Sequence, residues 1–443
     1  MNIQLSDHFT YQRLLRFTIP SIIMMILTSV YSIVDGLFVS NYVGKVSFAS
    51  LNLMYPLIMA VSTIGFMFAS GGSAIVAITL GEGRKQKAQE YFSMIIYITI
   101  AIGIILSALT ITFMKPIALA LGASTQMLED CIVYGNILTF GLTAFMLQII
   151  FQSFFVTAQK PQMSLKISIL SGITNIVLDY IFVVVFKWGL AGAGIATIIG
   201  QMIGAIIPLI YFARENTSLL RLTKTKFYKR IFIKTCTNGS SELMTNISSS
   251  IVNILYNFQL MKLAGENGIS AYGVIMYASF IFSAIYLGYS IGSAPLVGYH
   301  YGAKNNNELK NLVKKSLIII LITGLVMTTL AQIFAGSLSY LFVGYDSKLY
   351  HMTRHGFKIF AFSFLISGFN IWGSGFFTAL GNGFVSAILA FLRTFVFQVI
   401  VVLLLPDLLG LNGIWLAVVV AEAMALCVTI FFLVQKNKEY YYF

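Results

Sequence analysis

Long apolar stretches alternate with short polar segments along the whole chain. Each of twelve stretches exceeds 20 residues. About 20 residues are enough for a helix to cross the roughly 30 Å hydrocarbon core of a bilayer. The alternation of apolar and polar positions that marks a membrane barrel is absent. We therefore expect helical spans at residues 14–39, 50–79, 92–114, 131–156, 163–186, 191–213, 233–262, 270–300, 312–335, 351–378, 384–406 and 411–434.

The composition agrees with an all-α polytopic membrane protein. Of the 443 residues, 58% are hydrophobic and only 10% are charged. A soluble protein of this length needs more charged residues to cover its surface. The three cysteines are scattered, with neither a metal-binding spacing nor a disulfide pattern.

The basic residues predict the orientation of the chain. The net charge is +13, but Lys and Arg collect in alternate loops: twenty fall on the side of both termini and seven on the other side. Because cytoplasmic loops carry the excess of positive charge, we expect both termini in the cytoplasm and the chain in the cell membrane. This distribution argues against a nucleic-acid partner, and the lipid bilayer is the expected environment.

An internal repeat organises the chain. A shift of 221 residues aligns Gly44 with Gly265, Ser62 with Ser283, Gly71 with Gly292, Gly81 with Gly302, Gly103 with Gly324, Gly135 with Gly356, Ser153 with Ser374, Thr157 with Thr378, Gly189 with Gly410 and Gly192 with Gly413. The shift spans six helices, so the two halves have the same orientation and are related by a pseudo-two-fold axis along the membrane normal. We expect two six-helix lobes, 1–213 and 235–443, joined by a basic cytoplasmic linker, 214–234. A cavity between two such lobes is the geometry of alternating access.

Two acidic residues lie inside apolar spans. Asp35 and Asp179 are each about 10 Å below the same boundary at 1.5 Å per residue, as is Thr197. Asn175 precedes Asp179 by one helical turn and shares its face, as Tyr31 does with Asp35. Carboxylate, amide and hydroxyl oxygens suit a hard cation such as sodium, and two close carboxylates can share a proton. We predict one proton or sodium site here; the alternative is two separately hydrogen-bonded structural acids.

The second half carries its own deep charges. Arg393 and Glu422 match in depth, which favours a structural ion pair over a second proton or substrate site. Glu242, near the start of its span, is a weaker candidate for a cavity residue. Further candidates for the cavity are the amides Gln148, Gln152, Gln201 and Asn370, although hydrogen bonding between helices explains such residues more often.

Catalytic and nucleotide-binding motifs are absent. The chain has no phosphate-binding loop and no Gly-x-Ser-x-Gly elbow, so we expect neither an enzyme nor a cofactor. His351 and His355 are four residues apart but have no third ligand, and we interpret them as surface groups.

The stretch Pro295–Ala303 resembles the multidrug and toxic compound extrusion (MATE) family. It departs from the family pattern at Ala294, which replaces Gln, and at His300, which replaces Asn. The first half resembles the DinF-like branch, whose pattern is matched by Pro20, Tyr31, Asp35, Asn175, Asp179 and Thr197. A proline inside a helix removes a backbone hydrogen bond and produces a kink, so Pro20 is either a hinge or a fixed bend.

The resemblance implies a transporter that exchanges protons, sodium or both for lipophilic, often cationic compounds. We expect a monomer. The alternative is a lipid-linked glycan flippase of the same wider superfamily. A flippase would need a strongly basic cavity, whereas Arg393 is the one clearly deep basic residue in the predicted spans.

Overall fold

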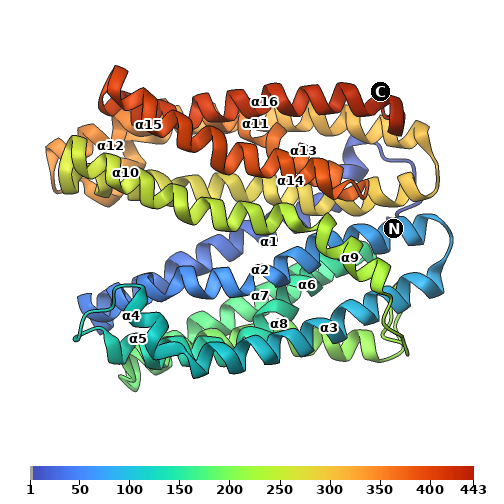
Figure 1. The fold of residues 1–443 in the computed structure, drawn as a ribbon, viewed down its shortest axis with the longest axis horizontal. Coiled ribbons are helices and arrows are strands. Elements are labelled where there is room, and N and C mark those ends of the chain that lie inside the picture. The colour runs from blue at the N-terminus through green and yellow to red at the C-terminus, as the bar shows by residue number, and fades with distance from the viewer. Residues whose placement is uncertain (1–2) are drawn as a thin grey trace.

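The computed structural model describes residues 3–443, without the side chains of Ser32 and Lys45. The helices form two bundles that lie side by side, one from each half of the chain (Figure 1). The first bundle contains α1 (Tyr11–Phe38), the π-helical η1 (Val39–Val43), α2 (Lys45–Gly81), α3 (Lys85–Thr112), α4 (Met114–Ala120), α5 (Leu128–Phe140), α6 (Leu142–Thr157), α7 (Pro161–Asp179), the π-helical η2 (Tyr180–Val185) and α8 (Gly189–Ala213).

The second bundle follows a short connecting helix, α9 (Lys229–Asn238). It contains α10 (Ser240–Gly302), α11 (Asn306–Val343), α12 (Ser347–Phe360), α13 (Ser363–Ala379), α14 (Gly383–Phe391), the π-helical η3 (Leu392–Val396), α15 (Phe397–Leu409) and α16 (Leu411–Tyr440).

The twelve expected spans are present. Nine segments of the described chain are long and apolar enough to cross a bilayer, and two bent helix pairs, α5–α6 and α12–α13, raise the number to eleven. One of the nine, Lys229–Gly302, is interrupted at Gly265, whose φ of 62° and ψ of −151° are not helical. This break divides α10 into two antiparallel spans, which gives twelve.

The repeat is visible in the local geometry of both halves. The bent pairs α5–α6 and α12–α13 occupy equivalent places and bend by the same 49°. Gly189 and Gly410, which the 221-residue shift aligns, both have left-handed φ values, 59° and 57°. A residue with a side chain seldom adopts this conformation. Both halves of the repeat therefore have a glycine at the same tight turn.

The connection between the bundles is irregular in its first part and helical in its last part. Helix α9 begins at Lys229, inside the basic stretch predicted as linker. The irregular part before it packs along α3: the Thr223 amide donates to Ser93 Oγ at 2.9 Å, and the Thr225 hydroxyl donates to the Glu90 carbonyl at 2.9 Å. These bonds hold the irregular segment against α3, so the connection is fixed to the first bundle.

The two bundles touch at the end of the molecule where both termini lie (Figure 1). At this closed end, a Cβ atom on Gly81 would overlap the Tyr299 carbonyl oxygen. A Cβ on Gly302 would overlap the carbonyl oxygen of Ile78 in the same way. The 221-residue shift relates Gly81 to Gly302 and Ile78 to Tyr299, so the two contacts are symmetry mates.

A second symmetric pair of contacts lies deeper in the molecule. A Cβ on Gly71 would lie 2.6 Å from the Gly239 nitrogen, and a Cβ on Gly292 would lie 3.0 Å from the Thr18 Cα. The same shift relates Thr18 to Gly239. The glycines therefore allow backbone-to-backbone packing of α2 and α1 against α10. Toward the opposite end the two bundles diverge (Figure 1).

The segment before α1 also joins the bundles at the closed end. The Phe9 amide donates to Glu308 Oε1 at 2.9 Å, and Lys315 Nζ donates to the Phe9 carbonyl at 2.8 Å. The side chains of Leu5 and Phe9 are fully buried beside Leu296. Residues that precede the first bundle are thus held by α10 and α11 of the second.

The symmetric glycine contacts predict that Gly302→Ala separates the bundles at the closed end. The added methyl overlaps a carbonyl oxygen, and overpacking of this kind costs roughly 1–3 kcal/mol. With spin labels at Lys85 and Lys304, on the exposed ends of α3 and α10, the measured label-to-label distance should increase.

Gly273→Ala is the matched control, because Gly273 is also on α10 and nothing lies within 4 Å of an added Cβ. Equal label distances in both variants and in the unsubstituted protein would contradict this account of the closed end.

Candidate functional site

The two acids predicted to form one site do lie together. Asp35 is near the end of α1, Asp179 is the last residue of α7, and their side chains are close enough to interact directly. Asp179 is fully buried. Neither of its carboxyl oxygens, nor Asp35 Oδ1, has a hydrogen-bond partner among the described residues. Buried polar atoms are normally paired, so these oxygens form an incomplete site that can take up a proton or a small cation.

A π-helical segment follows each acid. Helix α1 continues into η1 four residues after Asp35, and α7 becomes η2 directly after Asp179. The two segments contact each other. A π turn is a rare departure from the regular hydrogen-bonding pattern and often marks a functional site. Neither segment has a signal in the apolar pattern of the sequence, which continues through both.

Sequence reasoning missed a third side chain of this site. Tyr134 of α5 lies within electrostatic range of both Asp35 and Asp179, and it is 4% exposed. Its ring reaches this position beside Gly194 of α8, where an added Cβ would lie 3.2 Å from the ring. The only sign of it in the sequence is a tyrosine inside the span predicted at 131–156.

Tyr31 occupies a different place from the one expected of a carboxylate partner. Its ring lies against Gly172 of α7, where a Cβ atom would overlap three ring atoms. No hydrogen bond to Asp35 or Asp179 is found among the described contacts of Tyr31. The tyrosine therefore packs α1 onto α7 and sets how closely the two acid-bearing helices approach.

Asn175 and Thr197 lie on the two helices beside the acids. The Asn175 side chain faces α8 at Gly200, where an added Cβ would be 3.1 Å from Asn175 Cβ. Its Nδ2 is buried and has no partner among the described residues, as is true of Gln201 Oε1. The Thr197 hydroxyl donates to the Ala193 carbonyl of its own helix at 3.0 Å. Asn175 thus has free hydrogen-bonding capacity near the acids. The Thr197 hydroxyl proton, in contrast, already takes part in a hydrogen bond within α8.

Pro20 is buried where α1 crosses α10. Next to it, the Ser21 carbonyl oxygen is 2.8 Å from the place of a Cβ on Gly288. Helix α1 runs through Pro20 without interruption. The proline thus weakens the helix at a contact between the bundles, and its role as a hinge stays a prediction.

The second bundle contains the expected ion pair. Arg393 Nε lies 2.9 Å from Glu422 Oε1 and 3.1 Å from Oε2. Asn370 Nδ2 donates to Glu422 Oε2 at 2.7 Å, and the Thr429 hydroxyl donates to Asn370 Oδ1 at 2.9 Å. This network neutralises the carboxylate within the protein. Asn370 belongs to it and is not a separate cavity residue.

The repeat makes the comparison between the bundles direct. The residue equivalent to Asp35 is Tyr256, whose hydroxyl donates to Gln398 Oε1 at 2.9 Å. The residue equivalent to Gln201 is Glu422. The shift relates Asp179 to Ile400, so the second bundle has a paired tyrosine and an apolar residue at the positions of the two acids, and the two halves are not equivalent in chemistry.

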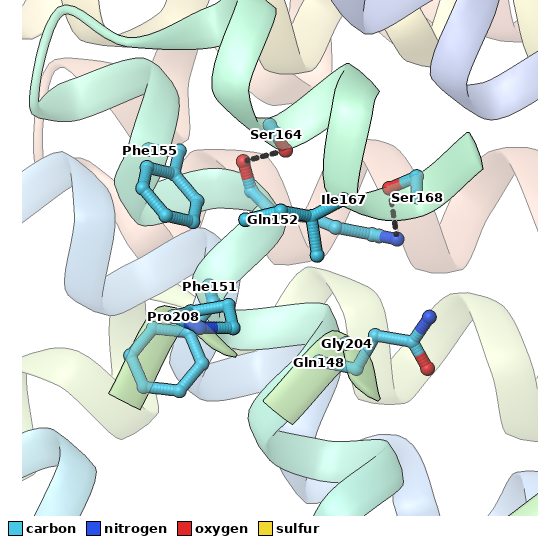
Figure 2. A pocket seen from close by; sticks show the side chains of 9 residues that line it. All are labelled: Gln148, Phe151, Gln152, Phe155, Ser164, Ile167, Ser168, Gly204 and Pro208. Atoms are coloured by element: carbon cyan, nitrogen blue, oxygen red, sulfur yellow. Dashed lines mark hydrogen bonds between the residues drawn. The ribbon is translucent and has the colours of Figure 1, made fainter. Parts of the chain in front are cut away.

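Gln148 and Gln152 lie inside the first bundle, in a small pocket between α6, α7 and α8 (Figure 2). Gln148 Nε2 donates to Ser171 Oγ at 3.2 Å, and Gln152 Nε2 donates to Ser168 Oγ at 3.3 Å. Both glutamines therefore connect helices, the alternative interpretation of such residues.

Two other polar candidates, Glu242 and His355, stand apart from these clusters. Glu242 is in the first turn of α10, close to where Gly239 meets Met67 of α2, and has no ion-pair partner among the described residues. His355 is exposed and pairs with Asn412 at 2.9 Å. Within the described chain, no group of three or more His, Cys, Asp or Glu side chains could hold a metal ion.

Multidrug export proteins of staphylococci are similar to this chain over nearly its whole length. Multidrug export protein MepA of Staphylococcus haemolyticus is 24% identical over 95% of this chain and 92% of its own length. MepA of Staphylococcus saprophyticus is 23% identical over 94% of this chain and 91% of its own length.

Solved structures share the fold. An outward-facing multidrug resistance MATE family transporter matches with a TM-score of 0.93 and 21% identity, covering 99% of this chain and 98% of that one. A transporter of the MOP superfamily from Pyrococcus furiosus, described as having a binding pocket of reversed polarity, matches with a TM-score of 0.90 and 20% identity over 96% and 95%.

The sequence profile of the MatE family matches twice, at residues 20–181 and 243–404, once in each half of the repeat. Since these two matches together cover most of the chain, the protein belongs to the MatE family of multidrug and toxic compound extrusion transporters.

Proposed function

We propose that this protein is a cation-coupled antiporter that exports lipophilic, often cationic compounds by alternating access. The coupling ion, a proton or sodium, binds at Asp35 and Asp179, with Asn175 and Tyr134 beside it. The observation that carries this proposal is a group of three buried carboxyl oxygens, Asp35 Oδ1 and both oxygens of Asp179, that lack partners among the described residues.

The physical reason is the cost of charge inside a membrane. Two carboxylates side by side in a medium of low polarity repel each other unless a proton or a cation is shared between them. No basic side chain of the described residues forms an ion pair with either acid, so the compensating charge must come from solution. The site therefore alternates between a loaded and an unloaded state, which is what coupling to an ion gradient requires.

The charge distribution sets the orientation. With the larger number of basic residues on the side of the termini, the closed end faces the cytoplasm and the acids lie in the outer half of the membrane. The ion then reaches the acids from outside while the bundles are parted there. The MepA relatives are named multidrug export proteins, which supports small lipophilic molecules as cargo. The protein acts as a monomer in the cell membrane.

The effect of ion binding at Asp35 and Asp179 is transmitted to the contacts between the bundles through α1. This helix carries Asp35 and Tyr31 on its outer half and Pro20 where it crosses α10. Neutralising Asp35 changes the packing of α1 on α7, and the weakened position at Pro20 lets the helix bend there. The bend disturbs the contact with Gly288 and Gly292, which holds the closed end together.

Asp35→Asn and Asp179→Asn should each abolish gradient-driven export, because an amide can neither release a proton nor provide the charge that a cation needs. The measurement is efflux of a lipophilic cation from vesicles under an imposed proton gradient, repeated with a sodium gradient, at matched protein abundance.

Asp407→Asn is the control, since Asp407 is an exposed acid of α15 and should transport normally. Undiminished efflux in both site variants would rule out the coupling mechanism.

The network in the second bundle should prove structural. Glu422→Ala leaves Arg393, whose side chain is 20% exposed, without its counter-charge, and breaking a buried ion pair typically costs about 3–5 kcal/mol. The variant should therefore unfold at a lower temperature in detergent. Replacing both residues together, Arg393→Met with Glu422→Met, should restore most of the stability and retain coupled export, because no charge is left unpaired. A stable double variant without coupling would show instead that the ion also uses this bundle.

A further inference from the structure

One face of α7 is polar along its whole length. The residues Ser164, Ser168, Ser171, Asn175 and Asp179 are spaced by four, three, four and four positions, so they form a single stripe on the helix. The stripe begins one turn inside Pro161, at the closed end, and finishes at the acid site. Four of its five side chains, all except Asn175, are buried.

The middle of the stripe is bonded to both neighbouring helices. The Ser171 hydroxyl donates to the Gly200 carbonyl of α8 at 2.6 Å, and it accepts from Gln148 of α6 at 3.2 Å. One turn further out, Asn175 Nδ2 is buried without a partner in the described structure. It lies between Ser171 and Asp179, so a water molecule bridging these two groups would find an unused donor there.

The part of the stripe nearer the closed end borders the pocket shown in Figure 2. Ser168 and Ser164 line this pocket together with Gln152, which donates to Ser168 Oγ at 3.3 Å. The Ser164 hydroxyl donates to the Gln152 carbonyl at 3.2 Å. The free space, about 10 Å³, is about what one water molecule needs, and the polar groups around it can bind one.

We propose that this stripe, with water in the pocket, is a proton path from Asp35 and Asp179 to the cytoplasmic end of the first bundle. This path rests on the proposed function, and it gives the site at Asp35 and Asp179 a route by which protons are released. A carboxyl O–H bond breaks as an O–H bond forms on water. Each serine hydroxyl then accepts one proton and passes on another, with no net change in any group. The pocket has room for about one water molecule, which can pass a proton between the side chains around it.

The path is interrupted in this state. Ser171 and Asp179 are two turns apart, and only Asn175 lies between them on the stripe. At the other end, Ser164 Oγ is 3.1 Å from Met24 Sδ, a fully buried side chain of α1. Met24 is one turn beyond Pro20, so bending of α1 at the proline moves Met24 relative to Ser164. A permanently open path would dissipate the gradient, and this arrangement prevents that leak while α1 is straight.

The test compares Ser168→Thr with Ser168→Val. The two side chains have nearly the same shape, but only threonine keeps the hydroxyl. In vesicles with an imposed proton gradient, Ser168→Val should slow proton-driven efflux of tetraphenylphosphonium about tenfold or more, while Ser168→Thr stays near the unsubstituted rate. The ratio of rates in H₂O and D₂O should rise in the valine variant. Tetraphenylphosphonium binding in detergent should be the same in both.

The same pair of substitutions at Ser107 is the control. Ser107 donates to the Thr139 carbonyl at 2.8 Å and so also connects two helices of the first bundle, but it lies outside the stripe. Ser107→Val and Ser107→Thr should transport alike.

Two results would overturn the path. Equal rates in Ser168→Val and Ser168→Thr, whether both normal or both slow, would reduce the stripe to helix packing. If Asp179→Asn still abolished efflux in that case, the proposed function would stand without this route. Normal efflux in Asp179→Asn would remove the proposed function itself.

Discussion

The structure depends on where charge is neutralised inside the membrane. In the second bundle, Arg393 neutralises Glu422 within the protein, and Asn370 completes the network. In the first bundle, Asp35 and Asp179 are adjacent without such a partner in the described chain. Burying an unpaired charge costs several kcal/mol, roughly, so the first bundle requires a charge from outside and the second does not. On the proposed function, one half of a symmetric architecture responds to ions, whereas the deep charge of the other half is neutralised within the protein.

The response can become a change of shape because the closed end is held by a few symmetric backbone contacts. Gly81 and Gly302 allow carbonyl groups of the opposite bundle to approach where any side chain would collide. Such packing does not loosen gradually. A small movement of one bundle relative to the other breaks both symmetric glycine contacts at once. The Phe9 amide donates to Glu308, and Lys315 donates to the Phe9 carbonyl, so hydrogen bonds also join the bundles at this end. The closed end therefore behaves as a two-state element, and a local event in α1 can decide its state.

The sequence predicts the parts of this design that follow from periodicity and burial. The lengths of the apolar runs predict the spans, the glycine register predicts the repeat, and depth alone brings Asp35 toward Asp179 and Arg393 toward Glu422. The missing parts follow from tertiary packing. The π segments η1 and η2 occur in uninterrupted apolar sequence, and no local pattern shows that the Tyr31 ring would lie on Gly172. Tyr134 was missed for the same reason, because its proximity to the acids depends on how α5 bends and packs on α8.

The position of the acids creates a problem that the stripe on α7 answers. Asp35 and Asp179 are nearer the end where the bundles part, whereas on the proposed function a proton that drives export has to leave at the other end. Release through the space between the bundles would make proton and cargo use one route in opposite directions. A route inside the first bundle separates them, and the polar face of α7 runs along this route from Asp179 to Ser164. Helix α1 touches both its ends, through Asp35 beside Asp179 and through Met24 beside Ser164. In the proposed mechanism, bending this one helix unloads the acids, opens the path and releases the closed end together, so proton movement stays tied to transport.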